Sequence, residues 1–336
     1  MNTKRVVALI IAAVLLFFSI GINTIITVFK TDFFSSFESM LETETLTYES
    51  VVESGDFSNR IAHLTVSGVI QDVGEPSVWE TVEYNHQAFM EQLDAVLEDE
   101  TVKAVLLSVN SPGGGVIESA EIHEKLVQIK EEKQIPIYVS MGSMAASGGY
   151  YISAPADKIF AQRETITGSI GVIMQSLNYS KLAEKVGIEY ETIKSGEHKD
   201  MFGGTRPSTP EELAMLQEMI DESYEEFVDI IEQGRNMSEA AVKKVADGRI
   251  LGGTQALKAG LVDEIGNEKA ALSALRAEQG LEDAQIFEYV TESDSWASLI
   301  GVKIGSMFSP SAETQAISKI ISSTSSPRMM YLYGEQ

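Results

Sequence analysis

Residues 102–129 decide the fold: VKAVLLSVNSPGGGVIESAEIHEKLVQI. The run 102–109 is short, apolar and rich in Val and Leu, which is typical of a buried strand. From Ile117 to Ile129 apolar residues recur at a helical spacing, and the turn 110–115 between the two segments contains three consecutive glycines. A buried strand that passes through a glycine turn into an amphipathic helix is a repeating unit of α/β domains.

The same alternation continues on both sides of this stretch. Strands are predicted at 61–70, 136–139, 158–161 and 188–193, and helices at 86–97 and after Ser208. The last helix has the clearest start, with Thr209 as N-cap, Pro210 at the first helical position and Glu212 completing a capping box. Strands separated by helices of this length need crossover connections, so we expect an α/β domain with mostly parallel strand pairing.

The composition excludes several kinds of protein. The chain has 336 residues, 44% of them hydrophobic, with 50 Asp and Glu against 25 Lys and Arg and a net charge of −25. It is therefore a globular protein, and the acidic excess disfavours a nucleic-acid partner because phosphates would be repelled. Cysteine-ligated metals are excluded because there is no Cys, and the four His make a histidine-rich metal site improbable. We expect no metal and no cofactor.

Residues 6–29 predict a transmembrane helix. They carry no charge and are rich in Leu, Ile, Val and Phe, and about 20 such residues are enough to cross a bilayer. A cleaved signal peptide is the alternative, but its apolar core would be shorter and followed by a small-x-small site. Lys4 and Arg5 precede the span and acidic residues follow it. The positive-inside rule thus predicts a single-pass protein of the cell membrane, with residues 1–5 cytoplasmic and the body extracytoplasmic.

The remaining boundaries follow from changes in composition. Residues 30–59 are acidic and rich in Ser and Thr, which predicts a stalk, and residues 60–300 show no internal repeat, which favours one domain. In the C-terminal segment 301–336, a Ser-rich spacer leads to a flexible apolar tail at 329–333.

The glycine turn at 110–115 is the first candidate for chemistry. Without side chains, its backbone N–H groups can converge next to the positive end of the following helix, which suits an anion or an oxyanion. It is not a phosphate loop of the Walker type, because no Gly-Lys-Ser/Thr follows. A turn that merely needs positive φ angles is an equally good interpretation.

Ser147 is the candidate nucleophile. It follows a predicted strand and lies between small residues in the segment MGSMAASGGY, 141–150, so that a helix start could pack closely and leave the hydroxyl reachable. The pattern is not Gly-x-Ser-x-Gly, and a buried structural serine is the plainer interpretation of this segment alone. Ser143 is a rival nucleophile.

The base that would activate this serine is the open question. Histidine is absent between Ser147 and His198, so a Ser–His–Asp triad is disfavoured, and a lysine whose pKa is lowered by burial is the alternative. Lys194 and Lys199 lie in a glycine-flanked loop, where functional side chains are common. The residues alone do not choose among Lys194, Lys199 and His198.

Four motifs together closely resemble the signal peptide peptidase A/protease IV family of serine peptidases. They are NSPGGG at 110–115, SMGSMAASGGYY at 140–151, TGSIGV at 167–172 and KSGEHKD at 194–200, in the expected order and spacing. The chain is similar to the short, single-domain form of Gram-positive bacteria. The resemblance implies a Clp-protease/crotonase-like α/β fold. Clp-type proteases use a later histidine, near which this chain has Val172, and this difference favours a lysine base.

The family's site residues can be carried over one by one. The resemblance implies that Ser147 is the nucleophile, that Lys199 is the general base and that Ser169 orients the lysine amine. The backbone N–H groups of Gly114 and of Ser147 or its neighbour would form the oxyanion hole. Each such donor lowers the barrier by about 3–4 kcal/mol in comparable hydrolases.

The resemblance also implies the substrates and the assembly. We expect an endopeptidase that degrades remnant signal peptides and other short apolar peptides through an acyl-enzyme. The family forms a dome of eight protomers in which neighbouring chains share each site, so a homo-octamer is expected. Tyr150, Tyr151 and Met144 are candidate specificity residues because they lie close to Ser147 in the sequence.

The tail at 329–333 resembles a substrate of such an enzyme, so we expect it to bind in the groove or to be trimmed by the protein itself. Two functions of other classes remain as alternatives. A crotonase-type acyl-CoA enzyme could use the same glycine turn as its oxyanion hole, and a catalytically silent membrane scaffold would keep the fold without turnover.

Overall fold

The computed structural model describes residues 47–74, 84–291 and 328–334, all within one compact unit, Thr47–Gln336. The predicted transmembrane helix at 6–29 lies outside the described residues, as do the first part of the predicted stalk and most of the C-terminal segment. Within the described ranges, none of the helices combines the length and hydrophobicity needed to cross a membrane.

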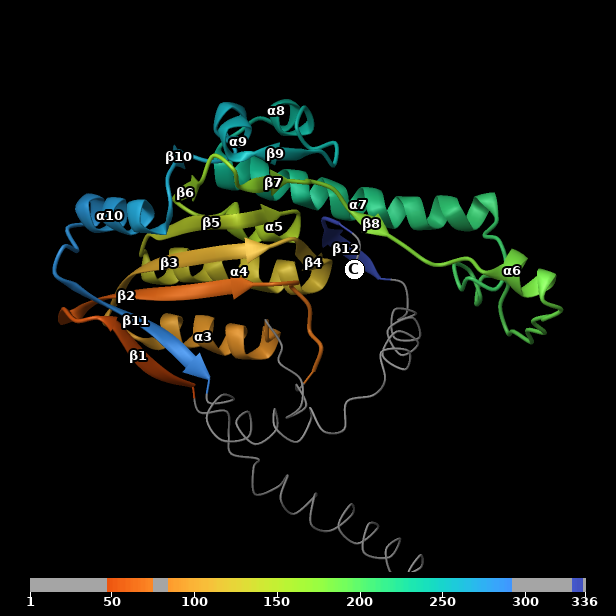
Figure 1. Cartoon of the computed structure of the whole chain (residues 1–336), viewed down its shortest axis with the longest axis horizontal. Helices are drawn as coiled ribbons and strands as arrows, with labels where there is room; N and C mark the ends of the chain where they lie inside the picture. Colours follow the sequence, from red (N-terminus) through yellow and green to blue (C-terminus); the bar gives the residue numbers. More distant parts are fainter. Residues whose placement is uncertain (1–46, 75–83, 292–327, 335–336) are drawn as a thin grey trace, which may run out of the picture. The chain divides into compact units, whose positions relative to one another are not determined.

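A largely parallel sheet forms the centre of this unit (Figure 1). Its strand order is β1-β11-β2-β3-β5-β6-β10, and β7 extends it from β5 to β9. The pairs that include β2, β3, β5 and β6 are parallel, whereas β1 pairs with β11 and β9 with β7 in antiparallel fashion. The strands span β1 Thr47–Glu53, β2 Asp56–Ser67, β3 Val102–Ser111, β5 Ile137–Ala146, β6 Lys158–Ala161, β7 Ile166–Gly168, β9 Ile250–Gly252, β10 Glu264–Ile265 and β11 Ala284–Thr291.

Helices cover both faces of this sheet (Figure 1). Alternate residues of the strands face opposite sides: Val105 and Leu107 pack with α4 residues such as Ile122, whereas Ala104 and Leu106 pack with Leu275 of α10. The helices span α3 His86–Glu98, α4 Val116–Lys133, α5 Gly148–Ser153, α6 Ser180–Lys185, α7 Pro210–Arg235, α8 Glu239–Lys243, α9 Gly253–Ala259 and α10 Glu268–Gln279.

Most predicted elements are present, with ends that shift by a few residues. The predicted capping box is confirmed: the Thr209 hydroxyl accepts from the Glu212 N–H, and the Glu212 carboxylate accepts from the Thr209 N–H. The strand predicted at 61–70 begins earlier, at Asp56, and β1 also lies within residues 30–59. Strand pairing therefore begins inside the segment predicted as a stalk.

The strand predicted at 188–193 is wrong. These residues form no strand or helix and follow α6 in an exposed loop, where Ile193 is 97% exposed. Among the described residues no strand pairs with this segment, and Tyr190 packs against the Tyr179 ring. Backbone groups without a partner strand do not form a sheet.

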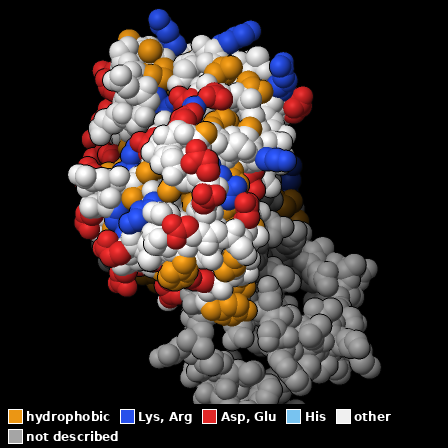
Figure 2. Space-filling view, turned by 90° about the vertical axis from the view of Figure 1, so that its left-hand side faces the viewer, with side chains coloured by type: hydrophobic (Ala, Val, Ile, Leu, Met, Phe, Trp, Pro, Cys, Tyr) orange, Lys and Arg blue, Asp and Glu red, His pale blue; other side chains and the backbone are white. Residues whose placement is uncertain are grey.

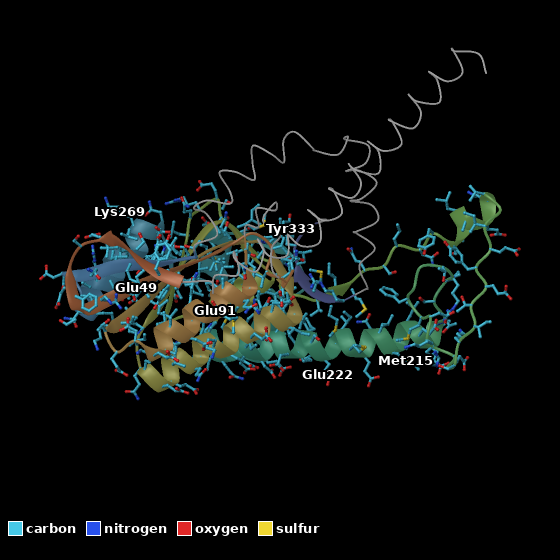
Figure 3. The ribbon with its side chains drawn as sticks, turned by 90° about the horizontal axis from the view of Figure 1, so that it is seen from below. Glu49, Glu91, Met215, Glu222, Lys269 and Tyr333 are labelled. Carbon is cyan, nitrogen blue, oxygen red and sulfur yellow. The ribbon has the colours of Figure 1, made fainter. Side chains whose placement is uncertain are left out.

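Two further features position the site. A small antiparallel sheet joins β4 (Gly113–Gly115), β12 (Met329–Leu332) and β8 (Ile173–Met174), so the C-terminal strand lies against the glycine turn. The amino-terminal half of α7 projects with α6 away from the main sheet, and Figure 3 shows Met215 in this projecting half. We call residues 175–209, which include α6, the arm.

The end of the unit that carries α10 and the turn between β1 and β2 has a mixed surface. On this face, acidic and basic side chains alternate, and hydrophobic side chains occur only in small groups (Figure 2). Such a surface is ordinary for a water-exposed face.

Candidate active site

Ser147 lies where β5 ends and α5 begins. Its backbone has φ 53° and ψ −117°, a conformation that few residues other than glycine adopt. The Ser147 N–H donates to the Gly168 carbonyl at 2.8 Å, which fixes the junction to the end of β7. The side chain is 1% exposed, and its Oγ has no hydrogen-bond partner among the residues that the structure describes. A buried, strained and unpartnered hydroxyl is unusual in a purely structural serine.

The glycine turn closes over this serine because side chains would not fit there. A Cβ on Gly113, which has φ 96°, would lie 2.0 Å from the Tyr331 carbonyl oxygen and 2.5 Å from the Gly148 nitrogen. A Cβ on Gly114 would lie 1.7 Å from the Ile70 carbonyl oxygen. The turn is held in place by the Gly115 N–H, which donates to that same carbonyl at 2.8 Å. The glycines therefore allow a peptide carbonyl to approach the backbone beside Ser147.

The peptide that approaches is the C-terminal tail itself. Strand β12 pairs antiparallel with β4, with Tyr331 opposite Gly114, and on its other edge with β8. The Tyr331 carbonyl oxygen and the Gly148 nitrogen both lie close to Gly113. Gly148 directly follows Ser147 and is the first residue of α5.

An aromatic pocket receives the Tyr331 side chain, which is completely buried. Its ring stacks on Tyr151, with centroids 4.8 Å apart, and meets Phe227 at 4.7 Å. The Tyr331 hydroxyl donates to the Ser223 carbonyl at 2.9 Å. Burial raises the pKa of the Tyr331 phenol, so the ring stays neutral.

Sequence reasoning found only part of this pocket. Tyr151 was a candidate and does line it, but the Tyr150 hydroxyl donates to the Leu261 carbonyl inside the core. Phe227 and Ser223 were missed as pocket residues because they come from α7, and only the fold brings that helix beside α5. The apolar face of α7 was the signal, but it indicated core packing as readily as a pocket.

A partly buried histidine lies behind the pocket. The His123 ring meets the edge of Tyr151 at 5.4 Å, and burial lowers the pKa of His123 to about 4. It is therefore neutral at pH 7 and acts as a packing group under Tyr151.

Ser169 lies beside Ser147. It directly follows Gly168, whose carbonyl accepts from the Ser147 N–H, and it too has a positive φ of 51°. The Ser169 N–H donates to the Arg249 carbonyl at 2.8 Å, and the residue is 8% exposed. The structure therefore brings Ser147, Ser169 and the glycine turn together.

Lys199 is not part of this group within one chain. It is exposed on the arm, and the Ser147 hydroxyl, which lacks a partner among the described residues, does not hydrogen-bond to it. Figure 1 shows α6 and the loops around it well apart from α5.

The other candidate bases on the arm are engaged elsewhere. The Lys194 ammonium contacts the Asp200 carboxylate and the Glu197 carbonyl, both at 2.7 Å. The His198 Nδ1 lies 3.6 Å from the Glu212 carboxylate. These contacts hold both side chains against other groups of the arm and the start of α7.

An ionic cluster braces the loop that carries Lys199. Arg206 donates to both Asp200 and Glu212, at 2.6 and 2.5 Å. These bonds hold the pKa of Asp200 well below its usual range and, together with the Thr209 N–H, lower that of Glu212 to about 2. Both carboxylates are therefore ionised, and the loop is attached to the start of α7.

The rival nucleophile Ser143 lies elsewhere. It is exposed on β5, and its hydroxyl donates to the Asn110 side chain at 2.8 Å. The geometry favours Ser147, because Ser147 directly precedes Gly148, which packs against Gly113 beside the docked tail, whereas Ser143 contacts only Asn110 at the start of the turn.

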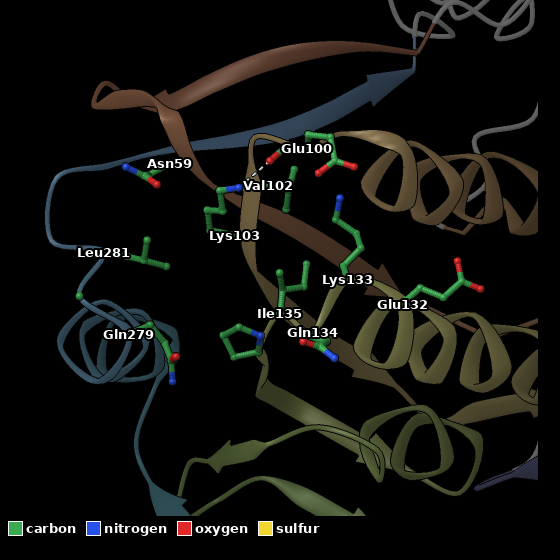
Figure 4. A pocket seen from close by; sticks show the side chains of 12 residues that line it. Asn59, Glu100, Val102, Lys103, Glu132, Lys133, Gln134, Ile135, Gln279 and Leu281 are labelled. Atoms are coloured by element: carbon green, nitrogen blue, oxygen red, sulfur yellow. Dashed lines mark hydrogen bonds between the residues drawn. The ribbon is translucent and has the colours of Figure 1, made fainter.

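A second cavity lies away from this site. It has a volume of about 590 Å³ and opens at the amino ends of β3 and β5, where Lys103, Lys133 and Gln279 line it (Figure 4). Its lysines donate to backbone carbonyls of Glu100, Leu97 and Asp99. In the ranges 47–74, 84–291 and 328–334, no three His, Asp or Glu residues are grouped so that they could hold a metal ion.

The α/β fold, the strained serine and the glycine turn that receives an extended peptide define a serine peptidase. Residues 129–282 match Peptidase family S49. The chain is 42% identical to the "Putative signal peptide peptidase SppA" of Enterococcus faecium, over 99% of each chain. It is 35% identical to "Protease 4" of Haemophilus influenzae, over 68% of this chain and 36% of the relative, and 32% identical to "Serine protease SPPA, chloroplastic" of Arabidopsis thaliana, over 64% and 32%.

The chain belongs to the signal peptide peptidase A/protease IV family of serine peptidases, Peptidase family S49. The predicted family and the predicted peptidase activity are confirmed.

Proposed function

We propose that this protein is a membrane-anchored endopeptidase in which Ser147 of one chain is activated by Lys199 of a neighbouring chain. The observation that carries this proposal is the docked tail: an extended peptide lies on the glycine turn with the Tyr331 carbonyl beside Gly113 and Gly148. This carbonyl belongs to the peptide bond between Tyr331 and Leu332, which is the bond that Ser147 would cleave.

The reaction would be acyl transfer with a lysine as the proton carrier. Neutral Lys199 takes the proton of the Ser147 hydroxyl while Oγ attacks the peptide carbonyl carbon. The resulting oxyanion is held by the N–H groups of Gly114 and Gly148. When the C–N bond breaks, the lysine returns its proton to the amine that leaves. A water molecule then loses a proton to the lysine and attacks the ester carbon. When the C–Oγ bond breaks, the lysine returns this proton to Oγ, which releases the acid and restores Ser147 and the neutral lysine.

Ser169 would orient the lysine in this proposal. Support comes from its position in the fold, since it directly follows Gly168, whose carbonyl accepts from the Ser147 N–H. A hydrogen bond between the Ser169 hydroxyl and the Lys199 nitrogen would hold the amine in the direction needed for proton transfer.

A second copy of the chain is the source of the lysine in this proposal. The arm exposes a group of large apolar side chains, which are between 49% and 97% exposed: Leu177, Leu182, Val186, Ile188, Tyr190 and Ile193. The projecting half of α7 adds Leu213, Met215 and Met219. Apolar side chains gathered on a projecting segment are typical of an interface with another copy. We therefore propose a ring of chains, with the octamer as the expected number.

The substrates we propose are remnant signal peptides and other short apolar peptides. Strand pairing on both edges of β12 requires an extended, unfolded chain, and the aromatic pocket requires a large apolar side chain. Residues 6–29 would anchor the protein in the cell membrane, with the peptidase domain on the extracytoplasmic side.

A serine-directed acylating probe tests this function. Purified full-length protein should be labelled at Ser147 and should cleave a fluorogenic peptide that copies residues 326–333, and Ser147→Ala should lose both properties. Labelling without cleavage would contradict the peptidase proposal. No labelling and no cleavage by well-folded protein would favour the scaffold, and saturable binding of coenzyme A would favour the acyl-CoA enzyme.

A further inference from the structure

A buried carboxylate lies at the amino-terminal end of the docked tail. Glu118, in the first turn of α4, is 8% exposed. Its Oε1 accepts from the Asp72 N–H at 3.0 Å, and a Cβ on Gly115 would lie 1.8 Å from its Oε2. The carboxylate is thus packed against the last glycine of the turn that binds β12.

The tail presents a guanidinium to this carboxylate. Arg328, the residue before β12, places Nη1 3.3 Å from Glu118 Oε1 and donates from Nη2 to Gln71 Oε1 at 2.7 Å. The Arg328 side chain is 43% exposed and that of Glu118 is 11% exposed. One partner therefore belongs to the domain and is fixed, whereas the other belongs to the peptide and is partly open to solvent.

The surroundings favour a positive charge at this position. Burial and the negative charges of Glu118, Glu121 and Asp72 raise the pKa of the Tyr84 phenol. Among these carboxylates, Glu121 contacts His86 at 2.7 Å, and Asp72 accepts from the Gly74 N–H at 2.8 Å. Glu118 is the carboxylate that contacts the tail.

The register relates this contact to the site of cleavage. Arg328 precedes Tyr331, the residue of the aromatic pocket, by three positions, and Met329 and Met330 lie between them in the paired strand. A peptide bound like the tail must therefore place a side chain at Glu118 whenever a large side chain fills the aromatic pocket.

We infer that Glu118 and Gln71 form a subsite for a basic side chain three residues before the residue held in the aromatic pocket. This inference rests on the proposed peptidase function and names a feature of its substrates. The enzyme prefers peptides in which Lys or Arg directly precedes an apolar run. Signal peptides have the same order of segments, because a positively charged n-region precedes their apolar h-region.

Two competing peptides test the subsite. Both copy residues 326–333 and carry distinguishable labels, but one has arginine and the other has citrulline, its neutral analogue, at the position of Arg328. When full-length protein cleaves both in one mixture, the ratio of kcat/KM is independent of how much of the groove the tail itself occupies. We expect about a fivefold preference for the arginine peptide, the effect of one partly exposed ion pair.

Two variants of the protein test whether Glu118 causes the preference for the arginine peptide. Glu118→Gln keeps an oxygen that can accept from the Asp72 N–H, so it should fold, and the ratio of kcat/KM for the two peptides should fall to about one. Glu121→Gln, the same change further along α4, should keep the fivefold ratio. An equal rate for both peptides in the unaltered protein, or an unchanged ratio in Glu118→Gln, would overturn the assignment.

Binding separates this inference from the proposed function. Ser147→Ala should bind the arginine peptide about five times more tightly than the citrulline peptide in a fluorescence anisotropy titration, and the double variant with Glu118→Gln should not distinguish them. If binding shows this preference while the unaltered protein cleaves neither peptide, the peptidase proposal fails and the subsite stands. If cleavage occurs but neither assay shows a preference, the subsite fails and the peptidase proposal stands.

Discussion

The Tyr331 ring stacks on the Tyr151 ring at 4.8 Å, with 25° between their planes. This contact joins β12 to α5, the helix whose N-cap is Ser147. A residue of the tail thus fills the pocket that a substrate side chain would need, and Tyr151 of that pocket lies one helical turn after the proposed nucleophile.

The tail should therefore inhibit the enzyme. Tyr331→Ala removes a fully buried aromatic side chain, which weakens docking by about 3 kcal/mol. We expect the initial rate on a fluorogenic peptide to rise at least severalfold at subsaturating substrate. Tyr333→Ala, a change of the same size beyond the pocket, should raise the rate much less. An unchanged rate in Tyr331→Ala would show that the docked tail does not compete with substrate.

The same docking predicts where the chain is trimmed. If the Tyr331–Leu332 bond is presented to Ser147, purified protein should lose residues 332–336 with time. Intact-mass spectrometry should detect this loss in the unaltered protein, whereas Ser147→Ala should keep its full length. Identical masses for both proteins would exclude self-trimming.

His123, the partly buried histidine behind the pocket, should make the stability of the protein depend on pH. The pKa of His123 is about 4 in the folded protein and about 6.5 in an unfolded chain, so the unfolded state binds more protons between these values. Protonation of His123 in the unfolded state should therefore lower the free energy of unfolding by about 2–3 kcal/mol from pH 6.5 to pH 4. Well above pH 6.5 the contribution of His123 should no longer change with pH. Urea titrations across this range should show a shallower slope for His123→Gln. An equal slope in both proteins would contradict the assignment.

A charge placed in the exposed apolar group on the arm should prevent assembly of the oligomer. Ile193→Asp should dissociate the oligomer and abolish peptidase activity, because each site would lose the lysine of its neighbour. Analytical ultracentrifugation gives the oligomeric state, and thermal unfolding shows whether the domain is intact. Val52→Asp, an exposed position on β1, should leave assembly and activity unchanged. An active monomer of Ile193→Asp would contradict the shared site.

The two lysines of the arm should differ in their effects. Lys194 is paired with Asp200, so Lys194→Ala should weaken the ionic cluster and lower kcat by less than about tenfold. Lys199→Ala should lower it by several orders of magnitude. The reverse order in a steady-state assay would make Lys194 the base.

Local patterns were enough to predict much of this molecule. The buried strand at 102–109, the helix that follows it and the capping box at Thr209 each depend on residues close together in the sequence, and all three are present. The tail was expected in the groove because it resembles a substrate of the family, and β12 pairs with Gly113–Gly115.

The rest required tertiary contacts that no local pattern contains. Residues 188–193 were predicted as a strand, but a strand also needs a neighbour, and the described residues of the arm offer none. Phe227 enters the pocket because α7 packs against α5, and Glu118 is identified as a subsite residue only by its contact with Arg328. The burial of Ser147 and the exposure of Lys199 likewise appear only in the folded chain.

The most direct test of the shared site is a mixture of two inactive proteins. Ser147→Ala and Lys199→Ala should each fail to cleave a fluorogenic apolar peptide. After the two full-length variants are dissociated and reassembled together at equal amounts, about one site in four should combine an intact serine with an intact neighbouring lysine, and activity should return in that proportion. A mixture that assembles but stays inactive, or activity in Lys199→Ala alone, would contradict a Ser147–Lys199 site formed between chains.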